Sequence, residues 1–350
     1  LRSKRMAGFQ LLDLQDYPGQ GSAYVGILDA FMDSKGLVEP KKWREFCSEV
    51  VPLLTTAKFC WTGGESFAGT VEIANYGETS LNGKSISWEL KDRKRSLGKG
   101  KVAIPSGLGL LTVGTICLTL PDVEQAYKAE LLLKVSGTSY QNSYPLWIYP
   151  AKKQLKTGNV VVARQLTDDV LNALKQGGKV LLMPRGEDCK EVTVGGLFQT
   201  DYWNYRMFKS ICDRKPASPG TLGILTNPTH PVFNDFPTEY HTNWQWYPII
   251  KHSYPLILDG MPKEYRPIVQ VIDNVERNHK LGLLMELNVE GGKLLLCMSD
   301  LEAVRDTPEG LQFYAVLLAY MNSSDFKPST SLSVESFKNL FEAGVRKSLN

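Results

Sequence analysis

The sequence lacks long apolar runs, and its charge is nearly balanced. Its longest apolar stretches, such as Leu131–Leu133 and Leu294–Leu296, are only strand-sized. A membrane-spanning helix needs about 20 apolar residues, so no membrane span is expected. Forty Lys and Arg residues face 37 Asp and Glu residues in a chain of 350 residues, which leaves a formal charge of +3. Nucleic-acid binding is not expected either, because it requires a concentrated basic surface.

Motifs for metal and cofactor binding are also absent from the sequence. The six cysteines are scattered without a C-x-x-C pair, and the four histidines form no H-x-x-H or H-E-x-x-H motif. No expected strand is followed by a G-x-G-x-x-G or a P-loop sequence. We therefore expect neither a metal ion nor any other cofactor.

A nucleophilic cysteine is not predicted. A strained strand-to-helix elbow needs small residues beside its nucleophile. Cys189 instead lies between Asp188 and Lys190, and Cys297 lies inside an apolar strand-like stretch. The best acid/base candidate, His230, precedes a proline in a turn-like segment. The sequence therefore predicts no catalytic residue, and whether the chain by itself is an enzyme stays open.

The periodicity of the sequence changes twice, which predicts three regions, namely 1–54, 55–150 and 151–350. The first region predicts a strand over Gly8–Leu14, a glycine-bearing loop over Tyr17–Ser22, and a helix that begins at Pro40 and is ended by Pro52. One strand and one helix cannot bury a core of their own. This region must therefore dock on something, either inside the chain or missing from it.

The second region predicts an immunoglobulin-like β-sandwich, because roughly seven short strands are separated by turns about every 8–12 residues. Its clearest expected strands are Ala57–Trp61, Phe67–Tyr76, Lys84–Leu90, Leu110–Leu120, Ala126–Ser136 and Tyr144–Tyr149.

The third region alternates helices and strands. Thr167 is expected to cap a helix over Val170–Gln176 that lies between two strands, Tyr202–Cys212 is expected to be helical, and a last helix opens at Thr307. The alternation predicts an open, doubly wound α/β domain of the flavodoxin or amidotransferase type.

Two aromatic-rich segments are candidate ligand-contact surfaces. The segment His241–Pro248 contains Trp244 and Trp246, and the segment Thr200–Tyr205 contains Trp203. Aromatic faces beside Asn, Gln and Asp side chains suit both sugar rings and protein partners. The alternative is that these tryptophans fill space between helices and a sheet.

The first expected strand ends in polar residues. Gln15, Asp16 and Tyr17 follow it, and in a (β/α)8 barrel this end of a strand carries ligand-facing residues. Glycoside hydrolysis uses two carboxylates, but Asp13 and Asp16 are three residues apart along one strand and its exit, so they point to opposite faces. They are therefore not an opposed catalytic pair, and at least one of them is expected to be structural or to orient a substrate.

The stretch Gly8–Asp16, followed by Gly19–Gly21, Gly26–Phe31 and Lys35–Leu37, resembles the last strand and helix of the catalytic barrel in family 2-type glycoside hydrolases. These are the relatives of β-galactosidase, β-glucuronidase and β-mannosidase. The chain looks most like the multidomain members of gut Bacteroidetes, in which the barrel precedes an immunoglobulin-like sandwich and accessory domains. The resemblance covers residues 8–40 in recognisable sequence and the whole chain in domain order.

This resemblance implies the C-terminal portion of a hydrolase that acts on β-linked glycosides. The family's acid/base and nucleophile glutamates follow the fourth and seventh barrel strands, and no residue of this chain matches either motif. The chain begins at Leu1 without Met, and is then expected to be a fragment that does not hydrolyse glycosides by itself. The resemblance also implies a carbohydrate partner and a periplasmic or secreted location. The predicted substrate-binding residues are Gln15, Asp16, Tyr17, Trp244 and Trp246.

Two rival hypotheses remain open. The chain could be a standalone carbohydrate-binding or assembly protein, in which the α/β region makes a protein–protein contact and the chain forms a homo-oligomer. It could also be a working amidotransferase-like enzyme, which would require Cys189 or Cys297 to be reactive.

Overall fold

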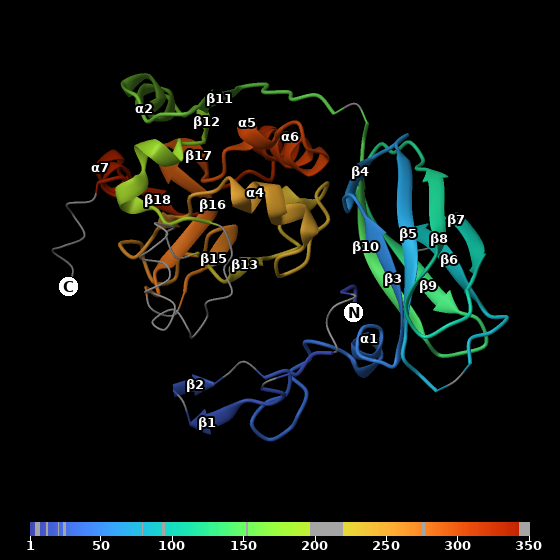
Figure 1. Cartoon of the computed structure of the whole chain (residues 1–350). Helices are drawn as coiled ribbons and strands as arrows, with labels where there is room; N and C mark the ends of the chain where they lie inside the picture. Colours follow the sequence, from blue (N-terminus) through green and yellow to red (C-terminus); the bar gives the residue numbers. More distant parts are fainter. Residues whose placement is uncertain are drawn as a thin grey trace. The chain divides into compact units, whose positions relative to one another are not determined.

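The computed structural model covers the whole chain and is shown in Figure 1. It describes residues 1–3, 8–11, 13–19, 21–23, 26–78, 80–92, 95–151, 153–196, 220–274 and 277–342. The chain divides into two compact units. Unit 1 comprises Leu1–Asp122 and Lys128–Trp147, and unit 2 comprises Val123–Tyr127 and Ile148–Asn350.

The beginning of unit 1 differs from the expected strand, loop and helix. Gly8–Leu14 forms no strand in its described residues, because Asp13 adopts a left-handed backbone with φ of +63° that interrupts an extended run. A short antiparallel hairpin, β1 (Tyr17–Gly19) and β2 (Gly21–Ala23), occupies the expected loop instead. The helix α1 (Pro40–Arg44) begins at Pro40 as predicted, since proline at the first helical position loses no hydrogen bond.

The rest of unit 1 consists of antiparallel sheets. A three-stranded sheet has the order β3-β5-β8, and a five-stranded sheet has the order β4-β10-β9-β6-β7. Every second residue of β9 is buried from Ala129 to Val135, which is the pattern of a strand with one face on a core. The strands are β3 (Val50–Thr56), β4 (Cys60–Thr62), β5 (Ser66–Asn75), β6 (Ser85–Asp92), β7 (Arg95–Ala103), β8 (Gly109–Thr119), β9 (Tyr127–Val135) and β10 (Gln141–Tyr149).

Two of these strands were not predicted. Pro52 was expected to end a helix, but it lies inside β3, opposite Ile73 of β5. Proline is tolerated there because β3 is an edge strand of its sheet. The strand β7 was missed because glycines and lysines alternate along it, and Gly100 lies against the ring of Trp88 where a larger residue would collide.

Unit 2 is built on one mixed sheet with the order β11-β12-β17-β16-β15-β13, and β14 and β18 also pair with β16. The strands β11, β12 and β17 run parallel to one another, whereas β17, β16, β15 and β13 pair antiparallel. Their bounds are β11 (Val160–Ala163), β12 (Lys179–Leu182), β13 (Gly223–Thr226), β14 (Leu256–Ile257), β15 (Val269–Ile272), β16 (Lys280–Val289), β17 (Gly292–Cys297) and β18 (Ser331–Leu332).

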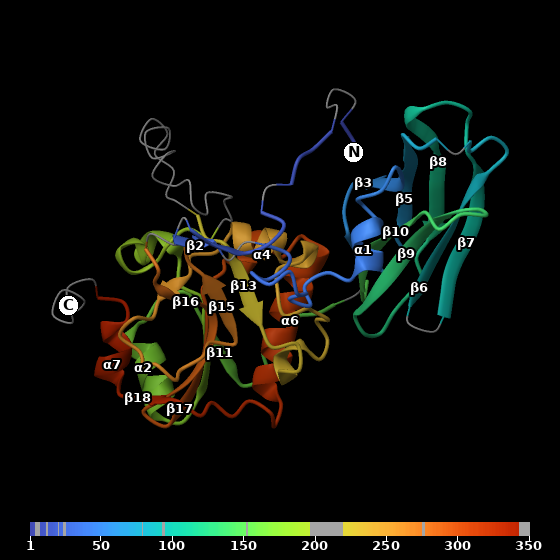
Figure 2. The same ribbon diagram turned by 90° about the horizontal axis from the view of Figure 1, so that it is seen from below.

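Helices lie on both sides of this sheet, as Figure 2 shows, with α2 and α7 on one side and α6 on the other. Thr167 caps α2 as predicted, because its side chain accepts a hydrogen bond from the backbone N–H of Val170. The apolar residues of α2 and α7 pack on β12, β16 and β17 in one core cluster. The helices are α2 (Asp168–Lys175), α4 (Tyr247–Lys251), α5 (Leu301–Val304), α6 (Pro308–Asn322) and α7 (Val334–Asn339).

The predicted fold class is wrong. It combined the end of a (β/α)8 barrel, an immunoglobulin-like β-sandwich and a doubly wound α/β domain. The described part of the chain is instead mostly β, with three sheets and one hairpin, and contains no barrel and no doubly wound sheet. The α/β prediction failed because β13, β15 and β16 join the sheet antiparallel, without the helical crossovers that parallel strands need. The expected helix Tyr202–Cys212 and the aromatic segment Thr200–Tyr205 lie outside the described residues.

Candidate functional site

Gln15, Asp16 and Tyr17 lie in a short loop and hairpin of unit 1, with Gln15 half-buried and Tyr17 exposed. Asp16 is buried, and its carboxylate accepts hydrogen bonds from the backbone N–H of Gly26 at 2.8 Å and from Lys35 at 2.6–2.7 Å. The hydrogen bond from Lys35 is the main reason that the pKa of Asp16 is lowered. Asp16 thus connects the chain at residue 16 to Gly26 and Lys35 further along the sequence. Its engaged carboxylate indicates a structural role.

Trp244 and Trp246 share the short 3-10 helix η4 (Trp244–Trp246) of unit 2, but their environments are opposite. The ring of Trp246 is fully buried and lies 6.1, 5.3 and 5.1 Å from the rings of Phe233, Phe236 and Phe313. Trp244 is 56% exposed. A sugar can therefore stack only on Trp244 without a rearrangement of the core. These two tryptophans belong to unit 2, whereas Gln15, Asp16 and Tyr17 belong to unit 1.

Burial affects both cysteines that were considered as nucleophiles. It raises the pKa of the Cys189 thiol to about 11 and that of the Cys297 thiol to about 12. The Cys297 thiol also donates a weak hydrogen bond to the backbone oxygen of Ser299. Because the thiolate is the nucleophilic form, neither side chain is prepared for covalent catalysis near neutral pH. This environment disfavours the amidotransferase-like hypothesis.

Alkylation with iodoacetamide at pH 8 is expected to modify Cys189 and Cys297 at least about tenfold more slowly than the exposed Cys117. A raised pKa keeps each thiol almost fully protonated at pH 8, and burial also hinders access of the reagent. Timed labelling followed by peptide mass spectrometry measures the three rates in one sample. Labelling of either buried cysteine as fast as Cys117 would contradict this expectation.

An ion pair occupies the carboxyl edge of the parallel strands of unit 2, where α/β proteins often bind ligands. Arg164 follows β11, and its two terminal nitrogens donate to the carboxylate of Asp300 at 2.8 and 2.9 Å. This hydrogen-bonded pairing is the main cause that raises the pKa of Arg164 and lowers that of Asp300. Since each group neutralises the other, the pair leaves no free charge for a ligand at this edge.

A surface groove lies elsewhere in unit 2, and we call it the Glu286 groove. Its volume is about 610 Å³, which lies within the range of roughly 300–1,000 Å³ typical of small-molecule sites. It is assembled from β13, β15, β16, the loop before β15 and the segment before β18. The polar residues that line it include Thr226, Asn227, His230, Gln270, Glu286 and Thr330.

Three charged residues line the groove, Glu264, Arg266 and Glu286, and the carboxylate of Glu286 is held by a hydrogen-bond partner. Glu286 lies within β16, and its Oε2 accepts a hydrogen bond from the hydroxyl of Tyr320 at 2.6 Å. Tyr320 lies on α6 and is almost fully buried. Burial, together with this carboxylate, raises the pKa of Tyr320, so the hydroxyl remains a donor. Tyr320 therefore fixes one oxygen of Glu286 and leaves the carboxylate oriented in the groove.

His230 supplies a second fixed group. Its ring contacts that of Tyr320, with centroids 5.5 Å apart, and its Nδ1 accepts a hydrogen bond from the backbone N–H of Val232 at 3.3 Å. Burial lowers the pKa of His230, so the neutral ring predominates at pH 7. A neutral imidazole that accepts at Nδ1 carries its proton on Nε2. The groove thus combines a carboxylate acceptor with a neutral ring donor.

Sequence analysis missed Glu286 and singled out His230 only as a poor acid/base candidate. One signal was available for Glu286, since it is an acidic residue inside the apolar stretch Leu283–Leu287. A buried strand carries a carboxylate only when the carboxylate has a partner. Its partner, Tyr320, lies 34 residues further along the chain, and no local pattern connects the two.

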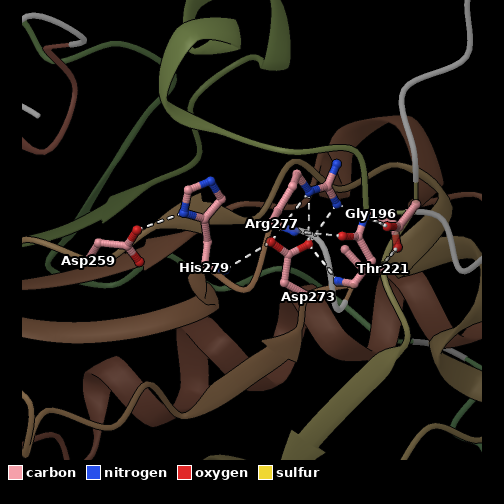
Figure 3. A network of polar contacts seen from close by, with 8 residues as sticks. Gly196, Thr221, Asp259, Asp273, Arg277 and His279 are labelled. Carbon is pink, nitrogen blue, oxygen red and sulfur yellow. Dashed lines mark hydrogen bonds and ion pairs between the residues drawn. The ribbon is translucent and has the colours of Figure 1, made fainter. Parts of the chain in front are cut away.

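A polar network lies beside the groove and is shown in Figure 3. The buried carboxylate of Asp273 accepts hydrogen bonds from Arg277 at 2.6 Å and from the backbone N–H of His279 at 3.0 Å. Arg277 also donates to the backbone oxygen of Gly220 at 3.0 Å. The ring of His279 lies 2.6 Å from a carboxylate oxygen of Asp259. The network therefore stabilises the backbone that leads into β16.

Neither a metal centre nor a membrane-spanning helix is found among the described residues. No group of three or more His, Cys, Asp or Glu side chains there is arranged to hold a metal ion. No helix in the same part of the chain is both long and apolar enough to cross a bilayer.

Two family models match the sequence. Residues 161–342 match a model described as a domain of unknown function (DUF8487), which covers more than half of the chain. The chain belongs to the DUF8487 family. Residues 65–150 match a second model, also described as a domain of unknown function (DUF8488). The Glu286 groove lies entirely within the DUF8487 region. No curated protein gave a match.

Solved structures show only distant, partial likeness. A β-glucosidase from Listeria innocua in complex with glucose has 21% identity and a TM-score of 0.22, with 29% of this chain and 16% of that chain covered. A putative β-galactosidase from Bacteroides fragilis has 14% identity and a TM-score of 0.22, with 38% of this chain and 24% of that chain covered. The alkylpurine DNA glycosylase AlkC from Pseudomonas fluorescens, bound to DNA with an abasic site analog, has 8% identity and a TM-score of 0.21. The match covers 29% of this chain and 31% of that chain. The chain spans less than a third of each of these proteins, and TM-scores of this size assign no function.

Proposed function

We propose that this chain binds carbohydrate through the Glu286 groove, as the non-catalytic C-terminal portion of a glycoside hydrolase that acts on β-linked glycosides. The observation that carries the binding proposal is the lining of the groove, where a fixed carboxylate and a neutral imidazole face hydroxyl and amide side chains. The hydrolase context rests only on the sequence resemblance of residues 8–40 to family 2-type glycoside hydrolases, and not on a barrel, since Gly8–Leu14 forms no strand in its described residues.

The lining suits a ligand with many hydroxyl groups. A sugar hydroxyl donates one hydrogen bond and accepts others, so it needs donors and acceptors close together. In the groove, Glu286 accepts, the Nε2–H of His230 donates, and the amide of Gln270 can do both. The amide nitrogen of Asn227 can donate, while its oxygen accepts from the backbone N–H and the hydroxyl of Thr229. Polar groups of this kind, held by a rigid strand and helix, fix the orientation of a small ligand.

The proposed role is binding rather than hydrolysis. No residue of the chain matches either catalytic glutamate motif of the family that residues 8–40 resemble. One oxygen of Glu286 is occupied by the hydroxyl of Tyr320, which favours a stable hydrogen-bonding carboxylate. We therefore assign Glu286 to sugar orientation and assign no catalytic residue.

Calorimetric titration of the whole chain with β-linked mono- and disaccharides of galactose, glucose, mannose and glucuronate tests the proposal. At least one of them should bind, and Glu286→Gln should weaken that binding about tenfold or more, because a hydrogen bond to a charged acceptor contributes about 1.5–3 kcal/mol. Glu290→Gln is the matched control, since Glu290 is exposed at the end of the same strand and does not line the groove. Binding that is equal in both variants, or absent for every sugar, would reject the proposal.

A further inference from the structure

A second hollow continues from the Glu286 groove. Its volume is about 490 Å³, and Arg266 and Gln270 line both hollows, so the two form one continuous surface. Three cationic side chains, Lys263, Arg266 and Lys280, lie along the second hollow, which we call the cationic hollow. Asp259 is the single acidic residue among those that line it.

Two of the three cations, Lys280 and Arg266, are held by neutral backbone oxygens. The ammonium of Lys280 donates to the backbone oxygen of Pro262 at 3.0 Å, and a terminal nitrogen of Arg266 donates to that of Tyr265 at 3.0 Å. In the described part of the chain, no ion pair joins Lys263, Arg266 or Lys280 to a carboxylate. Carbonyl oxygens thus position Lys280 and Arg266 without cancelling their charge.

Asp259 does not neutralise the cationic hollow by direct contact. One of its oxygens lies 2.6 Å from the Nδ1 of His279, and the other accepts the backbone N–H of Lys280 at 2.9 Å, as Figure 3 shows for the histidine. Its oxygens are therefore engaged with groups other than the three cations. Burial, and after it the nearby charge of Arg266, lowers the pKa of Lys280, while the charges of Glu264 and Asp259 act in the opposite direction.

The distances allow one ligand to reach both hollows. The ammonium of Lys280 lies 5.7 Å from the ring centroid of Tyr265, and the hydroxyl of that ring lies 3.5 Å from the backbone oxygen of Glu286. Lys280 begins β16, the strand that carries Glu286, and the ring of Tyr265 contacts both the Lys280 ammonium and the backbone oxygen of Glu286. A ligand of one or two sugar units spans these distances.

We infer that the ligand of the Glu286 groove is an anionic sugar whose acid group lies in the cationic hollow, against Lys263, Arg266 and Lys280. This inference rests on the proposed carbohydrate binding. The acid group is a uronate carboxylate or a sulfate ester, because both are singly charged oxyanions that accept hydrogen bonds from ammonium and guanidinium groups. The sugar hydroxyls then meet Glu286 and His230, so that opposite ends of one ligand meet opposite charges.

Titration of the whole chain with four probes tests the inference: methyl β-glucuronide, its methyl ester, methyl β-glucoside and methyl β-glucoside 6-sulfate. At least one of the two anionic sugars should bind about tenfold tighter than the uncharged probes, which corresponds to one charge-assisted hydrogen bond. The preferred anion identifies the acid group. Raising the ionic strength to 0.5 M should reduce the preference, because the cations are only partly buried.

Two variants connect the preference to the hollow. Lys280→Gln should reduce the preference for the anionic sugar to less than about threefold while leaving the affinity for the glucoside unchanged, since only the charge-assisted contact is lost. Lys263→Gln should act in the same direction, and because Lys263 is exposed, this variant keeps the test valid if Lys280→Gln fails to fold. Lys251→Gln, an exposed lysine outside both hollows, should change nothing.

The outcomes separate this inference from the proposed function. Equal binding of charged and uncharged sugars would overturn the inference and leave carbohydrate binding intact. Absence of binding for all four probes would overturn the inference, and it would overturn the proposed function as well if the galactose and mannose sugars also fail to bind. A preference for the anion that persists in Lys280→Gln and Lys263→Gln would place the acid group elsewhere and also overturn the inference.

Discussion

Trp246→Ala is expected to destabilise unit 2 by about 3–5 kcal/mol, the range for removal of a large buried aromatic side chain. The ring is completely buried, and it packs edge-on against Phe233, Phe236 and Phe313 of α6. Its Nε1 also donates to the hydroxyl of Thr238 at 2.9 Å. Alanine would leave a cavity between these rings and would remove the N–H that donates to the Thr238 hydroxyl.

Trp244→Ala is the matched control, because it removes the same side chain two positions earlier in the same 3-10 helix. Trp244 is 56% exposed, so its loss should cost less than about 1 kcal/mol. Denaturant unfolding followed by circular dichroism is the suitable measurement, since tryptophan fluorescence would lose its reporter. Similar losses of stability in the two variants would contradict the assignment of Trp246 to the core.

The contrast between these two tryptophans shows a limit of sequence reading. Both stand in the segment His241–Pro248 with similar neighbours, and composition alone made both of them candidates for sugar contact. Burial separates them, and it depends on Phe313, which lies 67 residues after Trp246 in the sequence. For Trp244, contact with a sugar stays a proposal.

Local patterns located many individual elements. The expected strand Phe67–Tyr76 corresponds to β5, and the helices at Pro40 and Thr307 begin where proline and a capping threonine placed them. These features depend on neighbouring residues, such as alternation, an N-cap or a proline in the first turn.

Topology was not contained in such patterns. Buried strands have similar apolar sequences whether their sheet is parallel or antiparallel. The apolar sequence of β16 therefore did not show that this strand pairs antiparallel with β17. The barrel strand expected over Gly8–Leu14 failed for a similar reason, since nothing nearby predicted the left-handed backbone of Asp13. The Glu286 groove was missed because its residues come from segments between 225 and 330 that meet only in the folded chain.

Arg277→Met is expected to destabilise unit 2 by about 3 kcal/mol, at the lower end of the cost of breaking a buried ion pair. The side chain of Asp273 is only 1% exposed, and Arg277 is the cation that contacts it. Methionine keeps much of the length of arginine but leaves the buried carboxylate without its countercharge. The full cost is not expected, because the backbone N–H groups of Asn274 and His279 still donate to this carboxylate.

The exposed ion pair between Arg305 and Glu302 provides the control for charge removal. Its side chains are 56% and 39% exposed, so Arg305→Met should cost at most about 1 kcal/mol. The double variant Asp273→Asn/Arg277→Met tests the physical cause. If the uncompensated charge is responsible, the double variant should be more stable than Arg277→Met in denaturant unfolding. If both unfold alike, the loss comes from the missing hydrogen bond between Arg277 and Gly220, and the network of Figure 3 is held by backbone contacts rather than by charge.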